Sequence, residues 1–197
     1  VAVGDLLYVL GETRGELGGS ELARARGLVL DGVPTTDLER CAARYRAFAA
    51  ARDAGLVRSA HVAGRGGLAV ALAHLAIAGE LGIRVELAPV LAPGLGHVLG
   101  DMSQWAGAAL FSESTGRILL TCGPQRAAAL EAALAGHGLL RIGAIEAPRS
   151  GDEGPAVRGG MTPPTGGWLQ VWRGSQLLLE HATTRLRAAF QGGAADV

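Results

Sequence analysis

The sequence contains no lysine and no asparagine in its 197 residues. All 18 basic residues are therefore arginines, and they balance 18 acidic residues, so the formal net charge at pH 7 is zero. A chain without a basic surplus gives no reason to expect nucleic acid or an anionic membrane as a partner. The absence of lysine also excludes a P-loop lysine that would hold nucleotide phosphates.

Cysteine is nearly absent too, since only Cys41 and Cys122 occur, far apart and without C-x-x-C spacing. Each lies in an apolar pattern, which is typical of buried thiols in a reducing compartment. The first ten residues lack the basic start of a signal peptide, and no apolar run reaches the length of a membrane span. Metal-ligand spacings and a G-x-S-x-G nucleophile motif are also missing. These features predict a cytoplasmic protein.

Hydrophobic residues make up 49% of the chain, enough for one good core at this length. Length alone suggests one domain, with a fragment of a second. The chain begins without methionine, inside a strand-like segment, so we expect it to be a piece of a longer protein.

The stretch 56–82 carries the strongest candidate site, because a basic loop broken by glycines runs directly into an apolar helix. Gly64, Gly66 and Gly67 allow the backbone to turn tightly and to approach a ligand closely. The helix start at Leu68 adds free N–H groups and the positive end of the helix dipole. This arrangement predicts a cradle for a phosphate, although the same glycines also fit an ordinary turn before a helix.

The same loop resembles the histidine-started glycine loop of the AIR synthase superfamily, whose pattern reads H-D-x-S-D-G-G-L. The chain keeps four positions of that pattern: His61, Gly66, Gly67 and Leu68. Both aspartates and the serine are lost, and the residues found in their places are Val62, Gly64 and Arg65. Two further motifs extend the resemblance, GETRGELGGSEL (Gly11–Leu22) and LFSESTGRILLT (Leu110–Thr121). In this order and at these distances, the motifs are similar to the C-terminal part of the phosphoribosylformylglycinamidine synthase large-subunit family.

The resemblance implies an α+β fold, an AIR synthase C-terminal-like domain in which helices cover a mixed β-sheet. It also implies two parts, a remnant of an N-terminal-type (A) domain at 1–32 and a C-terminal-type (B) domain at 33–197, with Pro34 at the boundary. The strand expected at Asp5–Leu10 would then lack sheet partners within the chain. We therefore expect residues 1–32 to be removable without unfolding the rest.

The resemblance further implies that the full-length parent is an ATP-dependent ligase of purine biosynthesis. It would convert formylglycinamide ribonucleotide to the amidine with ATP and Mg²⁺, and its partners would be a glutaminase, small accessory subunits and the rest of the parent chain. Metal-assisted phosphoryl transfer needs carboxylate or asparagine ligands. Because this piece has no asparagine and lacks both loop aspartates, we expect it to bind or support rather than to catalyse, and we assign no catalytic or metal-binding residue.

A nucleotide or phosphate site is predicted from the glycine loop and from the acidic-serine-glycine-arginine element, which the resemblance places near the nucleotide end of the domain. In the latter, a turn separates Glu113 from Arg117 and brings both to the mouth of a strand; a structural ion pair is the alternative. The predicted binding residues are His61, Arg65, Gly66, Gly67, Glu113, Ser114, Gly116 and Arg117.

Periodicity and helix signals predict the remaining elements. Helices are expected from Ser20 to Arg26, from a Thr36/Glu39 capping box to Gly55, and at 68–81, 124–135 and 176–190. Strands are expected at 5–10, 83–87, 117–122 and 139–145, with an edge strand at 168–173 and one more near Val157. The helix after Thr36 is expected to turn Leu38 and Tyr45 inward and its arginines, Arg44 among them, to solvent. His74 is expected to be a satisfied core or boundary histidine.

Two other functions remain open from the sequence. One is a different ATP-using enzyme of the same superfamily, such as AIR synthase, a selenophosphate synthetase or a hydrogenase-maturation protein. The other is a non-catalytic interaction domain, which the missing loop aspartates favour.

Overall fold

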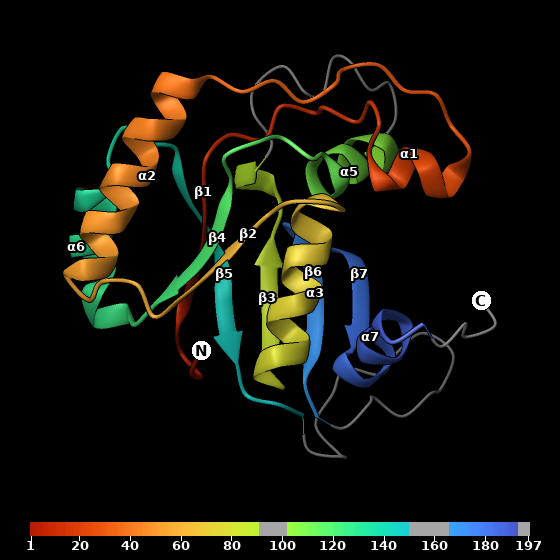
Figure 1. Ribbon diagram of the computed structural model, residues 1–197. Helices are drawn as coiled ribbons and strands as arrows, with labels where there is room; N and C mark the ends of the chain where they lie inside the picture. The colour runs from red at the N-terminus through yellow and green to blue at the C-terminus, as the bar shows by residue number, and fades with distance from the viewer. Residues whose placement is uncertain (91–101, 150–165, 193–197) are drawn as a thin grey trace.

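The computed structural model describes residues 1–90, 102–149 and 166–192. The strands of these residues form one seven-stranded mixed sheet (Figure 1). All neighbouring strands are antiparallel except β3 and β6, which run parallel. From edge to edge the strands are β2 (Ser59–Val62), β4 (Ile118–Cys122), β1 (Leu6–Leu10), β5 (Leu139–Glu146), β3 (Gly82–Glu86), β6 (Trp168–Arg173) and β7 (Gln176–Ala182).

Strand β1 lies in the interior of the sheet, between β4 and β5. Its first residue, Leu6, pairs with Cys122 on one side and Ala144 on the other. All five of its residues are buried, as an apolar run covered on both faces requires. The expectation that this strand lacks partners within the chain is therefore wrong. The assignment of residues 1–32 to an A-type domain stays a prediction, but their strand belongs to the same sheet as the rest.

Helices cover both faces of the sheet, which confirms the predicted α+β class. On one face Leu7 and Val9 pack with Leu72 of α3, and on the other Tyr8 and Leu10 pack in a second cluster. Figure 1 shows α3 along the sheet and α2 beside α6 on the other side. The helices are α1 (Glu21–Arg26), α2 (Leu38–Asp53), α3 (Gly67–Gly79), α5 (Met102–Phe111), α6 (Ala127–Ala133) and α7 (Thr183–Phe190), with short 3₁₀ turns η1 (Ala88–Val90) and η2 (Pro124–Arg126).

Helix α2 forms as predicted, but its cap and its faces differ. Asp37, not Thr36, caps it by accepting a hydrogen bond from the Arg40 amide at 3.0 Å. Leu38 is 76% exposed and Tyr45 is also exposed, whereas Arg44 is buried. The Arg44 guanidinium donates to backbone carbonyl oxygens outside the helix, and these bonds compensate its burial.

The C-terminal region differs most from the sequence-based expectation. The helix expected at 176–190 is strand β7 up to Ala182 and helix α7 only from Thr183. Strand β6 is interior rather than an edge strand, because β7 pairs with it through a hairpin that turns at Gly174. Pairing with β6 overrides the local helical preference of the leucine run in β7.

One expected element, the strand near Val157, falls outside the described residues. Among the helices that the structure describes, none combines the length and apolarity needed to cross a bilayer.

Candidate functional site

The sequence motifs that carry the resemblance meet at one place in the fold. We call residues 11–22, 63–67 and 112–117 together the motif cluster. Strand β1 leads into the first segment, β2 into the second and α5 into the third. The Glu113 amide donates to the Glu16 carbonyl oxygen at 3.2 Å, and the Arg14 amide donates to the Ser114 hydroxyl at 3.0 Å. Segments about a hundred residues apart in sequence are thus joined directly.

The Glu113 carboxylate lies at the centre of the motif cluster. Its Oε1 atom accepts hydrogen bonds from the amide of Gly66 at 2.9 Å and from the amide of Glu21 at 2.8 Å. These amides belong to the N-terminal ends of α3 and α1, where N–H groups lack partners within the helix. An internal carboxylate therefore occupies one of the donors that the sequence offered to a phosphate, the Gly66 amide.

Arg65 points outward from the glycine loop, and its side chain is 81% exposed. Its Nε atom donates to Oε1 of Glu21 at 2.8 Å. Hydrogen bonds from Arg24 and then from Arg65 lower the pKa of Glu21, so its carboxylate is charged at neutral pH. The positive charge of Arg65 is paired within the chain.

The glycines of the loop serve close packing. Gly66 and Gly67 both have positive φ angles, 77° and 65°. A Cβ atom on Gly67 would collide with the carbonyl oxygen of Ser112 and would lie 2.7 Å from that of Leu110. The start of α3 thus rests directly on the end of α5, and glycine is needed there for contact with the protein's own backbone.

Arg117 is fully buried, and its guanidinium is satisfied by the chain. It donates to the Ser114 carbonyl oxygen at 3.1 Å, to the Thr13 hydroxyl at 2.9 Å and to the Ser112 carbonyl oxygen. Burial lowers the pKa of Arg117 to about 10, so it remains charged at pH 7. Gly116 has a φ of 76°, and its carbonyl oxygen accepts a bond from Arg44. Arg117 faces the interior and not a solvent-filled mouth.

Glu16 belongs to the same cluster, although the sequence did not single it out. Its Oε1 accepts bonds from the Thr35 amide at 3.1 Å and from Arg14 at 3.2 Å. Its buried Oε2 has no hydrogen-bond partner among the described residues. Burial raises the pKa of Glu16. Ser114, the Thr35 amide and Arg14 together lower this pKa by more than burial raises it, so the net shift is downward. The sequence signal that could have identified Glu16 was its place in the GETRGELGGSEL motif.

His61 lies apart from the other predicted residues. It belongs to edge strand β2, which occupies part of the region expected to be loop. Its Nε2 atom is 3.3 Å from Nδ1 of His74 on α3, so His74 has a polar partner, as expected, in His61. Burial, and secondarily His74, lower the pKa of His61.

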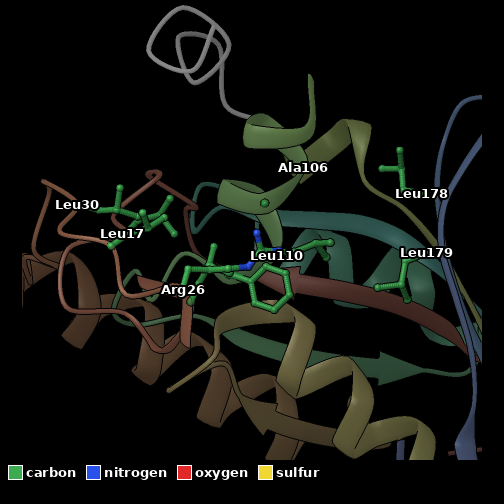
Figure 2. Close-up of a pocket in the computed structure, with 11 residues that line it drawn as sticks. Leu17, Arg26, Leu30, Ala106, Leu110, Leu178 and Leu179 are labelled. Carbon is green, nitrogen blue, oxygen red and sulfur yellow. The ribbon is translucent and has the colours of Figure 1, made fainter. Parts of the chain in front are cut away.

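An apolar groove of about 510 Å³ lies beside the motif cluster. Figure 2 shows Leu17 and Leu30 at one end and Leu178 and Leu179 at the other, with Arg26 between them. Its lining comes from α1 and the residues around it, from α5 and from β7. Such a lining suits an apolar partner and offers few donors to a phosphate.

The donor set of the motif cluster does not fit a magnesium-bound nucleotide in this arrangement. Mg²⁺ prefers carboxylate oxygens and water. Both family aspartates are replaced, and in the described part of the chain no three histidine, cysteine or acidic residues gather as a metal site. The Glu113 carboxylate is already engaged with two amides.

Residues 2–153 match the family model described as AIR synthase related protein, C-terminal domain. The chain belongs to this family. It builds a mixed sheet with helices on both faces. The match begins at residue 2, ahead of the boundary predicted at Pro34.

Relatives of this AIR synthase C-terminal domain are PurL subunits. The chain is 46% identical over 123 residues to phosphoribosylformylglycinamidine synthase subunit PurL of Moorella thermoacetica, covering 62% of the chain. It is 30% identical over 193 residues, 96% of the chain, to PurL of Carboxydothermus hydrogenoformans. The matched regions span 15% and 22% of the length of those relatives.

Solved structures share the fold. Thermotoga maritima PurL complexed with FGAR superposes with a TM-score of 0.69 at 21% identity, over 94% of this chain and 28% of that one. The hydrogenase maturation protein HypE superposes with a TM-score of 0.55 at 20% identity, over 90% of this chain and 53% of that one. At these identities the likeness establishes the fold alone.

Proposed function

We propose that the chain is the C-terminal part of a PurL-type phosphoribosylformylglycinamidine synthase. In this proposal the parent enzyme acts in the cytoplasm and uses ATP with Mg²⁺ to amidate FGAR, with ammonia supplied by a glutaminase subunit and with a small accessory subunit as a further partner. The proposal rests on the PurL relatives and on the order of the motifs.

One observation supports a structural role for this part of the chain within the parent enzyme. Glu113 links the whole motif cluster, because its backbone amide contacts Glu16 and its carboxylate contacts Gly66 and Glu21. Groups that the sequence offered to a ligand are thereby used to hold the domain together. We infer that this part shapes and supports the enzyme, and that the chemical steps belong to other parts of the parent.

The predicted nucleotide or phosphate site stays part of the proposal. Binding at the glycine loop would require the Gly66 amide to leave Glu113 and Arg65 to leave Glu21. An anion would therefore compete with two internal carboxylates, so its affinity is expected to be low.

A chimera tests the proposal directly. The matching C-terminal part of Moorella thermoacetica PurL is replaced by this chain, and FGAR-dependent ADP release is measured with ammonia. We expect the chimera to be active and the isolated chain to release no ADP above a blank without FGAR. A folded but inactive chimera contradicts the family role, whereas activity of the isolated chain contradicts the supporting role.

A non-catalytic interaction domain is the second candidate, favoured by the replacement of the loop aspartates by Val62 and Arg65. Under this alternative the chimera is inactive although folded, and the isolated chain does not respond to ADP in a titration.

A further inference from the structure

Two imidazole rings meet at the surface where edge strand β2 passes helix α3. Nε2 of His61 lies 3.3 Å from Nδ1 of His74, and the rings stand nearly perpendicular, at 80°. The backbones that carry them are fixed, because β2 is paired with β4 and α3 is packed into the core. The fold therefore sets how far apart the two backbone positions lie.

In the described part of the chain, the two imidazoles contact each other and one aromatic ring. Among described residues, each histidine has the other as its hydrogen-bond partner, and the remaining ring contact of His74 is the edge of Phe190 at 5.0 Å. Imidazole binds metals in its neutral form, so a binding test should be made in neutral or mildly alkaline solution.

The distance between the two nitrogens matches that between ligands of one metal ion. Nitrogen ligands of zinc lie about 2.0–2.1 Å from the ion at tetrahedral angles, which separates them by about 3.3–3.4 Å. We propose that His61 and His74 together bind a divalent transition-metal ion, Zn²⁺ or Ni²⁺, with water in the remaining positions. In the described residues no third histidine, cysteine or acidic residue completes a cluster, so the coordination sphere stays open to solvent.

The choice of metal follows from the ligands. Imidazole suits zinc and nickel, whereas magnesium requires oxygen ligands that this pair lacks. The site is therefore independent of the Mg²⁺ in the proposed parent reaction. A bound ion would tie β2 to α3 and stabilise the fold by mass action.

The test uses the 197-residue chain without an affinity tag, titrated calorimetrically with ZnCl₂ and with NiCl₂ in a non-coordinating buffer at pH 7.5. His61→Gln and His74→Gln each remove one ligand and keep a polar side chain. His137→Gln is the matched control, because His137 lies in the turn after α6, outside β2 and α3. We expect one site in the wild type and in the control, and affinity at least about tenfold weaker in each ligand variant, since even indirect support of a ligand is worth that much.

Thermal unfolding provides a second readout that does not depend on heats of binding. Zn²⁺ should raise the midpoint of the wild type and of His137→Gln, and leave both ligand variants unchanged, while Mg²⁺ should shift none of them. Circular dichroism without metal establishes that each variant is folded. Failure of the wild type to bind, or wild-type affinity in either ligand variant or in the double variant, overturns the proposal.

Discussion

The Oε1 atom of Glu113 lies 2.9 Å from the backbone nitrogen of Gly66, at the start of helix α3. Helix starts after glycine turns commonly present such an N–H group to a phosphate. Here the positive end of the helix dipole stabilises a carboxylate that the chain itself supplies.

Removing the Glu113 carboxylate should destabilise the fold. Glu113→Ala leaves the amides of Gly66, which is buried, and Glu21, which is half-buried, without their acceptor. An unpaired buried N–H costs about 1–3 kcal/mol, and the half-buried one should cost less. Glu113→Gln keeps a neutral oxygen and should cost less. Urea unfolding measures both against Asp31→Ala, an exposed acidic position in the same region. Equal stability of Glu113→Ala and the control would show that the contact is unimportant.

Any nucleotide binding at the loop should be weak, independent of Mg²⁺ and sensitive to salt. The replacement of two family aspartates by Val62 and Arg65 removes two negative charges and adds a positive one, which favours a bare phosphate. Arg65→Ala should abolish binding. Glu21→Gln should strengthen binding by freeing Arg65, and Glu113→Ala should have a smaller effect in the same direction by freeing the Gly66 amide. Calorimetry with ADP, with and without Mg²⁺, measures these effects.

The control for this titration is Arg46→Ala, which removes an exposed arginine on α2, outside the motif cluster. Strict dependence on Mg²⁺, or unchanged ADP binding in Arg65→Ala, would identify the loop as a structural turn.

The first strand should be indispensable. Leu7→Ala removes a fully buried side chain from an interior strand and should cost about 2–5 kcal/mol. Leu38→Ala makes the same chemical change at an exposed position and should cost little. Deletion of residues 1–32 should abolish the cooperative thermal transition, contrary to the expectation from sequence. A deletion variant that still melts cooperatively would contradict the central role of β1.

Acid should weaken the fold partly through Glu16. Its pKa in the folded state is lowered below the ordinary 4.5, so the unfolded state binds more protons between the two values. The stability from Glu16 is thus fully present above about pH 5 and is lost as the pH falls through the folded pKa. Urea midpoints at pH 7 and pH 4 should differ less in Glu16→Gln than in the wild type; an equal difference would exclude this contribution.

The sequence predicted the elements that are determined by local signals, such as apolar periodicity and terminal glycines. Helices α2 and α3 have clear amphipathic or apolar patterns with caps and glycines at their ends, and both formed close to the expected bounds. The family and the fold class, predicted from the motifs, are confirmed.

Features that depend on distant partners were not predicted. No local pattern shows that Leu6 pairs with Cys122, or that Gln176–Ala182 pairs with β6 instead of extending α7. Arg117 illustrates the same limit, because a guanidinium in a turn motif predicts solvent exposure until its three buried acceptors are known. The sequence combined the glycine loop and the Glu113–Arg117 element into one predicted site, but it assigned Gly11–Leu22 to a different domain and did not show which internal groups would satisfy these motifs.

The position of β1 constrains the order in which the chain can fold during synthesis. Leu6 is made before both of its partners, because Cys122 and Ala144 follow it by more than a hundred residues. Closing such long loops is slow, and an unpaired apolar strand is prone to aggregation while it waits. Strand β1 therefore stays without its sheet partners until Ala144 has been made, and this favours protection of the nascent chain by a chaperone over that interval.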